Sequence, residues 1–171
     1  MPRTYRGVAA EKLARHHIEE YLKLYRMLME KSDIDKYDAI ALIAMATGRR
    51  VSEILGLEPG DVDFANRRIT FKILKKRGTY RLAIEISEKV WGKIEPFLRN
   101  LPFNLSRITV YKVFMKRYGY NPHAFRHFFA LYCLETYRDI ERCRRFLAHS
   151  NYNLLARYAD AVGIDLKTPL D

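Results

Sequence analysis

The feature that most constrains the fold is a pair of strand-forming runs in a chain whose other segments carry helical patterns. Residues 69–74 and 80–86 are rich in Ile, Leu, Phe, Tyr and Thr, and the segment between them contains Lys-Lys-Arg-Gly at 75–78. Two such runs around a short glycine-containing turn predict an antiparallel β-hairpin with a basic tip. The sequence therefore predicts an α+β fold, mainly α-helical, with a small antiparallel hairpin or sheet on one side.

Apolar residues recur at helical spacing along the other segments. The pattern predicts a long amphipathic helix over about 9–31 and a second helix from near Asp35 that stops at Gly48. Ser87 and Ser106 stand where the N-caps of two later helices are expected. The helices predicted after the second are a short one from about Ser52, then 87–98, 107–118, 123–136, 139–147 and 151–161.

A length of 171 residues without repeats or a linker predicts a single domain over 1–171. No run approaches the roughly 18 apolar residues of a membrane span, and the N-terminus lacks the apolar core of a secretion signal. We therefore expect no membrane partner, and a location in the cytoplasm or nucleoid, or in the host cytoplasm if the source is viral. Cys133 and Cys143 are too few for a disulfide framework.

The charge balance favours a polyanionic partner. The net charge of +11 and a pI near 9.7 suit nucleic acid, because neutralised phosphates release condensed counterions. Basic runs also occur on solvated faces, so charge alone leaves both interpretations open. The chain has no Gln and is rich in Lys, Arg and Glu, a bias of proteins from hot environments. The basic residues expected to contact DNA are Arg49, Arg67, Arg68, Lys72, Lys75, Arg77, Arg81, Lys112 and Lys116.

The segment 47–57, Thr-Gly-Arg-Arg-Val-Ser-Glu-Ile-Leu-Gly-Leu, places two arginines at a turn between helices. A guanidinium group there could bind a phosphate through two hydrogen bonds. A helix-turn-helix is the competing interpretation, since Ser-Glu-Ile-Leu-Gly-Leu resembles its first helix and turn. Glu-Pro-Gly-Asp at 58–61 and the hairpin that follows leave no recognition helix, which counts against it.

Four later residues, His123, Arg126, His149 and Tyr158, complete an ordered set. His123 and Arg126 are three apart at the start of a predicted helix, so both can face one anion. His123 and His127 could instead form a zinc pair, but Ala124 stands where the metalloprotease signature needs Glu, so we expect no metal. His149 follows 23 residues after Arg126, and Tyr158 nine residues after His149. Each of these residues alone would be explained by packing or solvation.

This set resembles the tyrosine recombinase, or phage-type integrase, family over about residues 44–159. The family places an arginine in Thr-Gly-x-Arg-x-Ser-Glu, a lysine on a β-hairpin, His-x-x-Arg, Leu-Gly-His and a nucleophilic tyrosine, in that order. The resemblance implies the catalytic fold of that family, and the composition suggests an archaeal or thermophilic viral or plasmid source. The implied catalytic residues are Arg50, Lys76, His123, Arg126, His149 and Tyr158.

The sequence departs from the family pattern in two places. Ala148 stands where the family usually has glycine before the histidine. Only about 38 residues precede the helix that leads to Arg50, whereas relatives usually carry a separate N-terminal domain that clasps DNA. We therefore expect that domain to be absent here, because the chain is either an excised catalytic fragment or a reduced one-domain enzyme.

The resemblance implies site-specific DNA recombination through a 3′-phosphotyrosyl intermediate, with DNA integration into a host genome as one setting. Tyr158 would attack the phosphate while Arg50 and Arg126 hold its oxygens. His123 would transfer a proton at Tyr158, His149 would contact a phosphate oxygen, and Lys76, or else Lys75, would protonate the leaving 5′ oxygen. No cofactor is expected, because the phosphotyrosyl ester retains the bond energy.

The expected partners are double-stranded DNA and further copies of the chain, as a tetramer on paired DNA sites. A type IB topoisomerase shares the Arg, Lys, Arg, His and Tyr chemistry but relaxes supercoils as a monomer. A non-catalytic DNA-binding regulator on the same fold is the other alternative. Such a regulator would have no use for a tyrosine at position 158.

Overall fold

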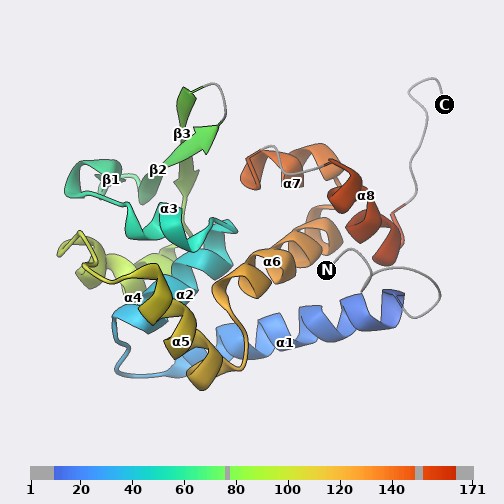
Figure 1. The fold of residues 1–171 in the computed structure, drawn as a ribbon, viewed down its shortest axis with the longest axis horizontal. Helices are drawn as coiled ribbons and strands as arrows, with labels where there is room; N and C mark the ends of the chain where they lie inside the picture. Colours follow the sequence, from blue (N-terminus) through green and yellow to red (C-terminus); the bar gives the residue numbers. More distant parts are fainter. Residues whose placement is uncertain (1–9, 76–77, 149–151, 165–171) are drawn as a thin grey trace.

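The computed structural model describes residues 10–75, 78–148 and 152–164. Helices dominate the chain, and three short strands stand together at one end (Figure 1). The elements in chain order are α1 (Ala10–Glu30), α2 (Lys36–Thr47), α3 (Val51–Leu55), the 3₁₀ turn η1 (Pro59–Asp61), β1 (Val62–Asp63), β2 (Arg68–Lys75), β3 (Gly78–Glu85), α4 (Glu88–Leu98), α5 (Arg107–Tyr118), α6 (Pro122–Tyr137), α7 (Ile140–Phe146) and α8 (Tyr152–Ala161).

Helices α2 and α6 form the centre of the core. The apolar run from Ala39 to Met45 is buried on every face of α2, which explains why this helix lacks a polar side. Helix α6 packs against α1, α2, α7 and α8, and α1 runs beside it in Figure 1. The predicted α+β fold is confirmed, and the predicted helix bounds agree with the structure to within a few residues.

The strands form one antiparallel sheet in the order β1-β2-β3. The β2–β3 pairing runs from Arg68 opposite Glu85 to Lys75 opposite Gly78, so the ladder continues almost to the tip. The predicted hairpin is confirmed, with β2 one residue longer at each end than the run 69–74. The sequence analysis missed β1, because a strand of two residues leaves no alternating pattern.

Capping side chains fix where the helices begin and end. Ser87 and Ser106 accept hydrogen bonds from backbone N–H groups in the first turns of α4 and α5, as predicted. Asp35 caps α2 in the same way, and Gly48 ends α2 with a φ of 67°. That left-handed conformation favours glycine, and it turns the chain directly into α3.

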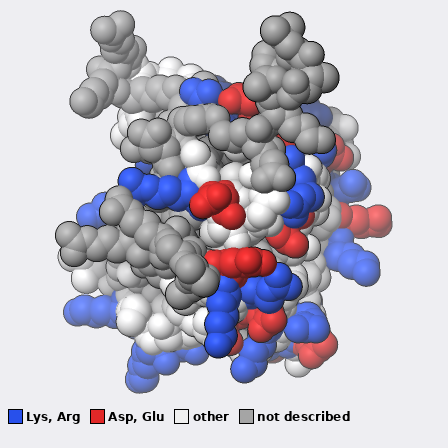
Figure 2. Space-filling view, turned by 90° about the vertical axis from the view of Figure 1, so that its right-hand side faces the viewer, with Lys and Arg blue, Asp and Glu red and all other residues white. Residues whose placement is uncertain are grey.

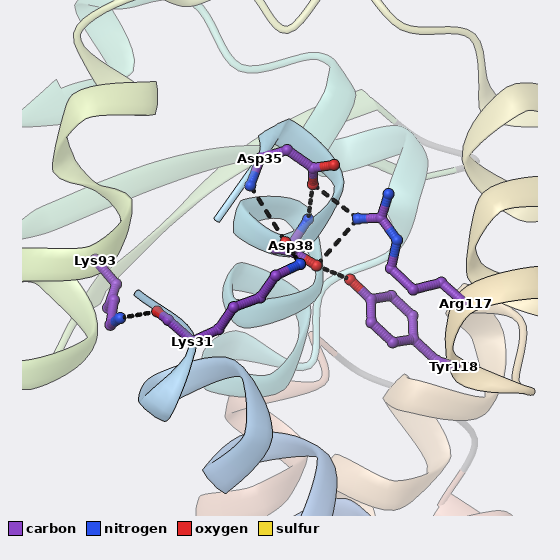
Figure 3. Close-up of polar contacts among 6 residues, drawn as sticks. All are labelled: Lys31, Asp35, Asp38, Lys93, Arg117 and Tyr118. Carbon is purple, nitrogen blue, oxygen red and sulfur yellow. Dashed lines mark hydrogen bonds and ion pairs between the residues drawn. The ribbon is translucent and has the colours of Figure 1, made fainter. Parts of the chain in front are cut away.

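A buried carboxylate ties α5 to the start of α2 (Figure 3). Asp38 is 0% exposed and accepts hydrogen bonds from Lys31 at 2.8 Å, Tyr118 at 2.5 Å and Arg117 at 3.1 Å. Burial alone would raise its pKa, but the hydrogen bonds from Lys31 and Tyr118 outweigh burial and lower the pKa to about 2. The network therefore anchors the C-terminal end of α5 and fixes the orientation of that helix.

Positive charge is not gathered on every face. Figure 2 shows the side that lies to the right in Figure 1, where acidic and basic side chains are interspersed among the residues drawn in colour. Among these coloured residues a polyanion would meet carboxylates as well as cations. None of the helices in the described part of the chain combines the length and apolar character needed to cross a membrane.

Candidate active site

A pocket of about 200 Å³ lies where α3, α5 and α6 meet. Its basic side chains, three arginines and a histidine, come from three separate segments: Arg50 precedes α3, Arg107 begins α5, and His123 and Arg126 lie in the first turns of α6. The full lining is Arg50, Val51, Ser52, Arg107, Tyr111, Pro122, His123 and Arg126. The structure thus brings together the predicted Arg50, His123 and Arg126.

Arg126 connects the pocket to the backbone around it. Its Nη1 donates to the carbonyl oxygen of Gly48 at 2.7 Å, and its Nη2 donates to that of Leu147 at 2.9 Å. The side chain is 7% exposed, so burial fixes the guanidinium plane as well. Arg126 is therefore rigid before any ligand arrives, which favours strong binding of an anion of fixed geometry.

Glu53 organises the two arginines at the turn before α3. Its Oε1 accepts a hydrogen bond from the backbone N–H of Arg50 at 2.8 Å, which caps the helix, and its Oε2 lies 3.7 Å from Nη1 of Arg49. Arg50 is exposed and points its charge at the pocket. Arg49 is 1% exposed, so it has no surface to offer a phosphate, and this burial contradicts the DNA contact expected for it.

The electrostatics of the site favour an anion. Burial, together with the positive charges of Arg49 and Arg50, lowers the pKa of Arg126 to about 9. Burial, together with the charges of Arg126 and Arg50, also lowers the pKa of His123, so its imidazole is neutral at pH 7. Three guanidinium groups thus stand near one another with Glu53 as the carboxylate beside them, and a bound phosphate would relieve their mutual repulsion.

Tyr158 approaches this region from α8 without lining the pocket. Its side chain is 1% exposed, and its hydroxyl is hydrogen bonded to Nδ1 of His127. We expected His123 to exchange a proton with Tyr158, and the structure instead places His127 against the hydroxyl. The two histidines are one helical turn apart, with ring centroids 4.5 Å apart, so His127 faces α8 while His123 faces the pocket.

Some predicted residues lie outside the described part of the chain: Lys76, Arg77 and His149. Other basic residues of the sheet have acidic neighbours, although residues 67–84 contain no acid. Lys72 lies 3.4 Å from Glu58, and Arg81 lies 3.8 Å from Asp61. Arg67 pairs with Glu85 at 3.8 Å, whereas Arg68, Lys112 and Lys116 are exposed.

Sequence reasoning missed two functional candidates, Arg107 and His127. Arg107 lines the pocket because the Ser106 cap starts α5 beside Arg50 and His123, a proximity that no local pattern encodes. In the sequence, His127 was considered only as the partner of His123 in a zinc pair, which Ala124 argued against.

Within the described residues, no three His, Cys, Asp or Glu side chains gather closely enough to hold a metal ion.

Comparison with known proteins agrees with this geometry. The sequence profile of the phage integrase family matches residues 15–101, just over half of the chain, including Arg50 and the hairpin. Tyrosine recombinase XerA of Pyrococcus furiosus is 26% identical, with 90% of this chain and 59% of the relative covered. Tyrosine recombinase XerC of Actinobacillus pleuropneumoniae is 29% identical, with 71% of this chain and 46% of the relative covered.

Solved structures show the same fold. The site-specific recombinase XerH, bound to palindromic difH substrate in a post-cleavage complex, superposes with a TM-score of 0.65. The two are 19% identical, and the match covers 86% of this chain and 49% of XerH. The fold is that of a tyrosine recombinase catalytic domain. The chain belongs to the phage integrase family, and it spans about half the length of the curated relatives it matches.

Proposed function

We propose that this chain cleaves and rejoins DNA strands through a covalent 3′-phosphotyrosyl intermediate on Tyr158, and that it does so in site-specific recombination. The observation that carries the proposal is the convergence of Arg50, His123 and Arg126 on one pocket. Tyr158 is held by His127, the residue that follows Arg126 in the chain. A nucleophile on α8 thus contacts α6, the helix that supplies two of the anion-binding side chains.

The chemistry follows from the charges. The phenol oxygen of Tyr158 attacks phosphorus, the bond from phosphorus to the 5′ oxygen breaks, and the phenol proton must leave. Arg50 and Arg126 stabilise the negative charge that builds on the non-bridging oxygens, and the guanidinium of Arg126 is already oriented by its hydrogen bonds to the backbone. Neutral His123 can accept a hydrogen bond or a proton in the pocket. Lys76 and His149 complete the proposed set as the proton donor to the 5′ oxygen and a further phosphate ligand.

The similar proteins support a function in site-specific recombination. XerA and XerC are tyrosine recombinases, and XerH was solved in complex with a difH substrate after cleavage. We infer that double-stranded DNA is the substrate here and that copies of this chain assemble on paired sites, as a tetramer. We propose the cytoplasm or nucleoid, or the host cytoplasm for a viral source, as the location, because such a substrate is found there.

Trapping the adduct tests this proposal. The chain is incubated with a DNA site nicked near the scissile phosphate, so that a short fragment diffuses away and the covalent protein–DNA species accumulates. Denaturing electrophoresis should show a shifted band with wild-type protein and none with Tyr158→Phe, while mobility-shift assays show equal DNA binding by both. The band should also form in excess EDTA.

Two outcomes would contradict the proposal. If the Tyr158→Phe chain forms as much covalent adduct as the wild-type chain, another residue is the nucleophile. Binding without any adduct from the wild-type chain would favour a non-catalytic DNA-binding protein. If adduct forms, relaxation of supercoiled DNA by the chain as a monomer, with no exchange between paired sites, would favour topoisomerase activity over recombination.

A further inference from the structure

The two cysteines of the chain lie against each other across the contact between α6 and α7. Cys133 is on α6 and Cys143 is on α7, and these helices pack together. Their side chains are 3% and 0% exposed, and both are free thiols. The side-chain hydrogen bond with Cys143, followed by burial, raises the pKa of the Cys133 thiol. All the thiols of the chain thus form one buried pair.

The thiol pair lies near a contact that holds the arginine pocket in place. Cys133 lies about two turns beyond Arg126 on α6, and Cys143 lies one turn before Leu147 at the end of α7. Nη2 of Arg126 donates to the carbonyl oxygen of Leu147 at 2.9 Å. The same two helices are therefore joined at two places, once by this hydrogen bond and once by the thiols. A covalent bond between the thiols would also restrain the Leu147 carbonyl.

A small reagent can reach one of the two thiols. Cys133 lines a pocket of about 420 Å³ formed by residues of α1, α2, α6 and the end of β3. Tyr21, Met45 and Phe129 are also part of its lining, and Cys143 is not. A disulfide reagent that enters this pocket therefore meets Cys133 first, and Cys143 then lies next to the mixed disulfide.

We propose that Cys133 and Cys143 form an intramolecular disulfide when the chain meets a low-molecular-weight disulfide, and that this bond fixes α7 against α6. The Cys133 thiolate attacks the reagent, one reagent thiol leaves, and a mixed disulfide forms. The Cys143 thiolate then attacks the sulfur of Cys133, and the second reagent thiol leaves. The protein thiols lose two electrons and two protons in total, and the reagent is reduced to two thiols. Neither step involves DNA, so the proposal goes beyond the proposed function.

Redox equilibration tests whether folding favours the bond. The chain is held in mixtures of hydroxyethyl disulfide and β-mercaptoethanol, both folded and in concentrated urea. Equilibration is slow, because a thiol with a raised pKa contains little thiolate. Acid quenching, alkylation with N-ethylmaleimide and mass spectrometry then count the free thiols. We expect the equilibrium constant for bond formation to be at least about tenfold larger in the folded chain, because folding places the thiols in contact.

The same measurement can overturn the proposal. An equal or smaller equilibrium constant in the folded chain would show that the native positions of Cys133 and Cys143 do not suit a disulfide. Disulfide-linked dimers in place of an oxidised monomer would also overturn it. The comparison of folded and unfolded wild-type chains does not depend on how well any variant folds.

Single-cysteine variants are the matched controls for the order of the two steps. Alanine is the replacement, because it is small and apolar and therefore suits a buried position. Cys143→Ala keeps the thiol that lines the pocket and should stop at the mixed disulfide. Cys133→Ala keeps only the thiol that is 0% exposed and should react more slowly with the reagent. The opposite order of reactivity would overturn the proposed route through Cys133.

Hydrogen exchange followed by mass spectrometry tests whether the bond fixes α7. Amide exchange in α7 should slow by about tenfold in the oxidised chain, because local opening of this short helix would then strain the bond. Exchange in α4, which packs against α2, should slow less. Unchanged exchange in α7, or equal slowing in both helices, would contradict this half of the proposal. An oxidised or reduced chain that forms no DNA adduct would count against the proposed function alone.

Discussion

The ring of Phe129 packs against the backbone of Gly48 so closely that a Cβ at residue 48 would overlap it. Gly48 also has a φ of 67°, which strains any residue with a side chain. Its carbonyl oxygen accepts the hydrogen bond from Arg126. One glycine thus lies between the central helix of the core and the turn that presents Arg50.

Adding one methyl group at residue 48, as in Gly48→Ala, should therefore strongly lower the stability of the folded chain. Left-handed strain and overpacking against Phe129 together predict a loss of roughly 2–4 kcal/mol in the free energy of unfolding. Urea denaturation followed by circular dichroism measures this. Gly92→Ala in α4 is the matched control, because a Cβ at Gly92 meets nothing within 4 Å, and that variant should be neutral or slightly stabilised.

Ala148→Gly should stabilise the chain. Ala148 follows the end of α7 with a φ of 51°, the conformation that glycine adopts without strain. Relief of the strain, offset by the greater backbone freedom of glycine in the unfolded chain, predicts a gain of about 0.5–1 kcal/mol. Thermal unfolding would show a higher Tm, and an unchanged or lower Tm would show that the backbone there is not strained.

Asp38→Asn should destabilise the chain at neutral pH and have a clearly smaller effect in acid. The Asp38 pKa of about 2 lies below the value of an unfolded aspartate, so its stabilisation is complete above about pH 4 and is lost as pH falls toward 2. The shift corresponds to about 2.5 kcal/mol at pH 7. Urea midpoints at pH 7 and pH 2.5 measure the difference, with Asp33→Asn at an exposed site as the control.

Arg107→Ala should weaken DNA binding without unfolding the chain. Arg107 lines the pocket from an exposed position, so its loss removes about one phosphate contact. The slope of log affinity against log salt should become shallower by about 1. Arg15→Ala on α1, where Arg15 pairs with Glu11 at 3.4 Å, should leave the slope unchanged. Equal slopes for both variants would place the phosphate contacts elsewhere.

Lys76→Ala should cleave normal DNA poorly and recover on a substrate whose 5′ bridging oxygen is replaced by sulfur. A thiolate, with a conjugate-acid pKa near 8.5, leaves without a proton, whereas an alkoxide does not. Arg50→Ala should stay impaired on both substrates, since its charge is needed in either case. Rescue of Lys75→Ala in place of Lys76→Ala would assign the proton donor to Lys75, and rescue of neither variant would limit these lysines to phosphate binding.

The sequence was sufficient to predict the fold class and most helices, because their signals are local. Caps such as Ser87 and Ser106 and the alternation around the hairpin act over a few residues. The spacing of Arg50, His123 and Arg126 also predicted their convergence, through its resemblance to a family whose fold brings such residues together.

Contacts between distant segments were not predictable in this way. Tertiary packing buries the side chain of Arg49 and leaves that of Arg50 exposed, although both arginines belong to the same turn. The pairing of Tyr158 with His127 depends on how α8 lies across α6, and one turn of α6 decides whether His123 or His127 meets it. Sequence spacing alone places both histidines on the same side of the helix.

The two hydrogen bonds from Arg126 to backbone carbonyls bear on how a descendant of this chain could lose its activity. A lineage released from selection for cleavage would no longer need the phenol of Tyr158 for chemistry, but replacing Arg126 would remove the donor that the carbonyl oxygen of Gly48 accepts from. Arg126 would therefore persist in proteins that no longer cut DNA. We therefore expect an arginine at this position to mark shared ancestry, and a tyrosine at position 158 to be the better indicator of cleavage activity.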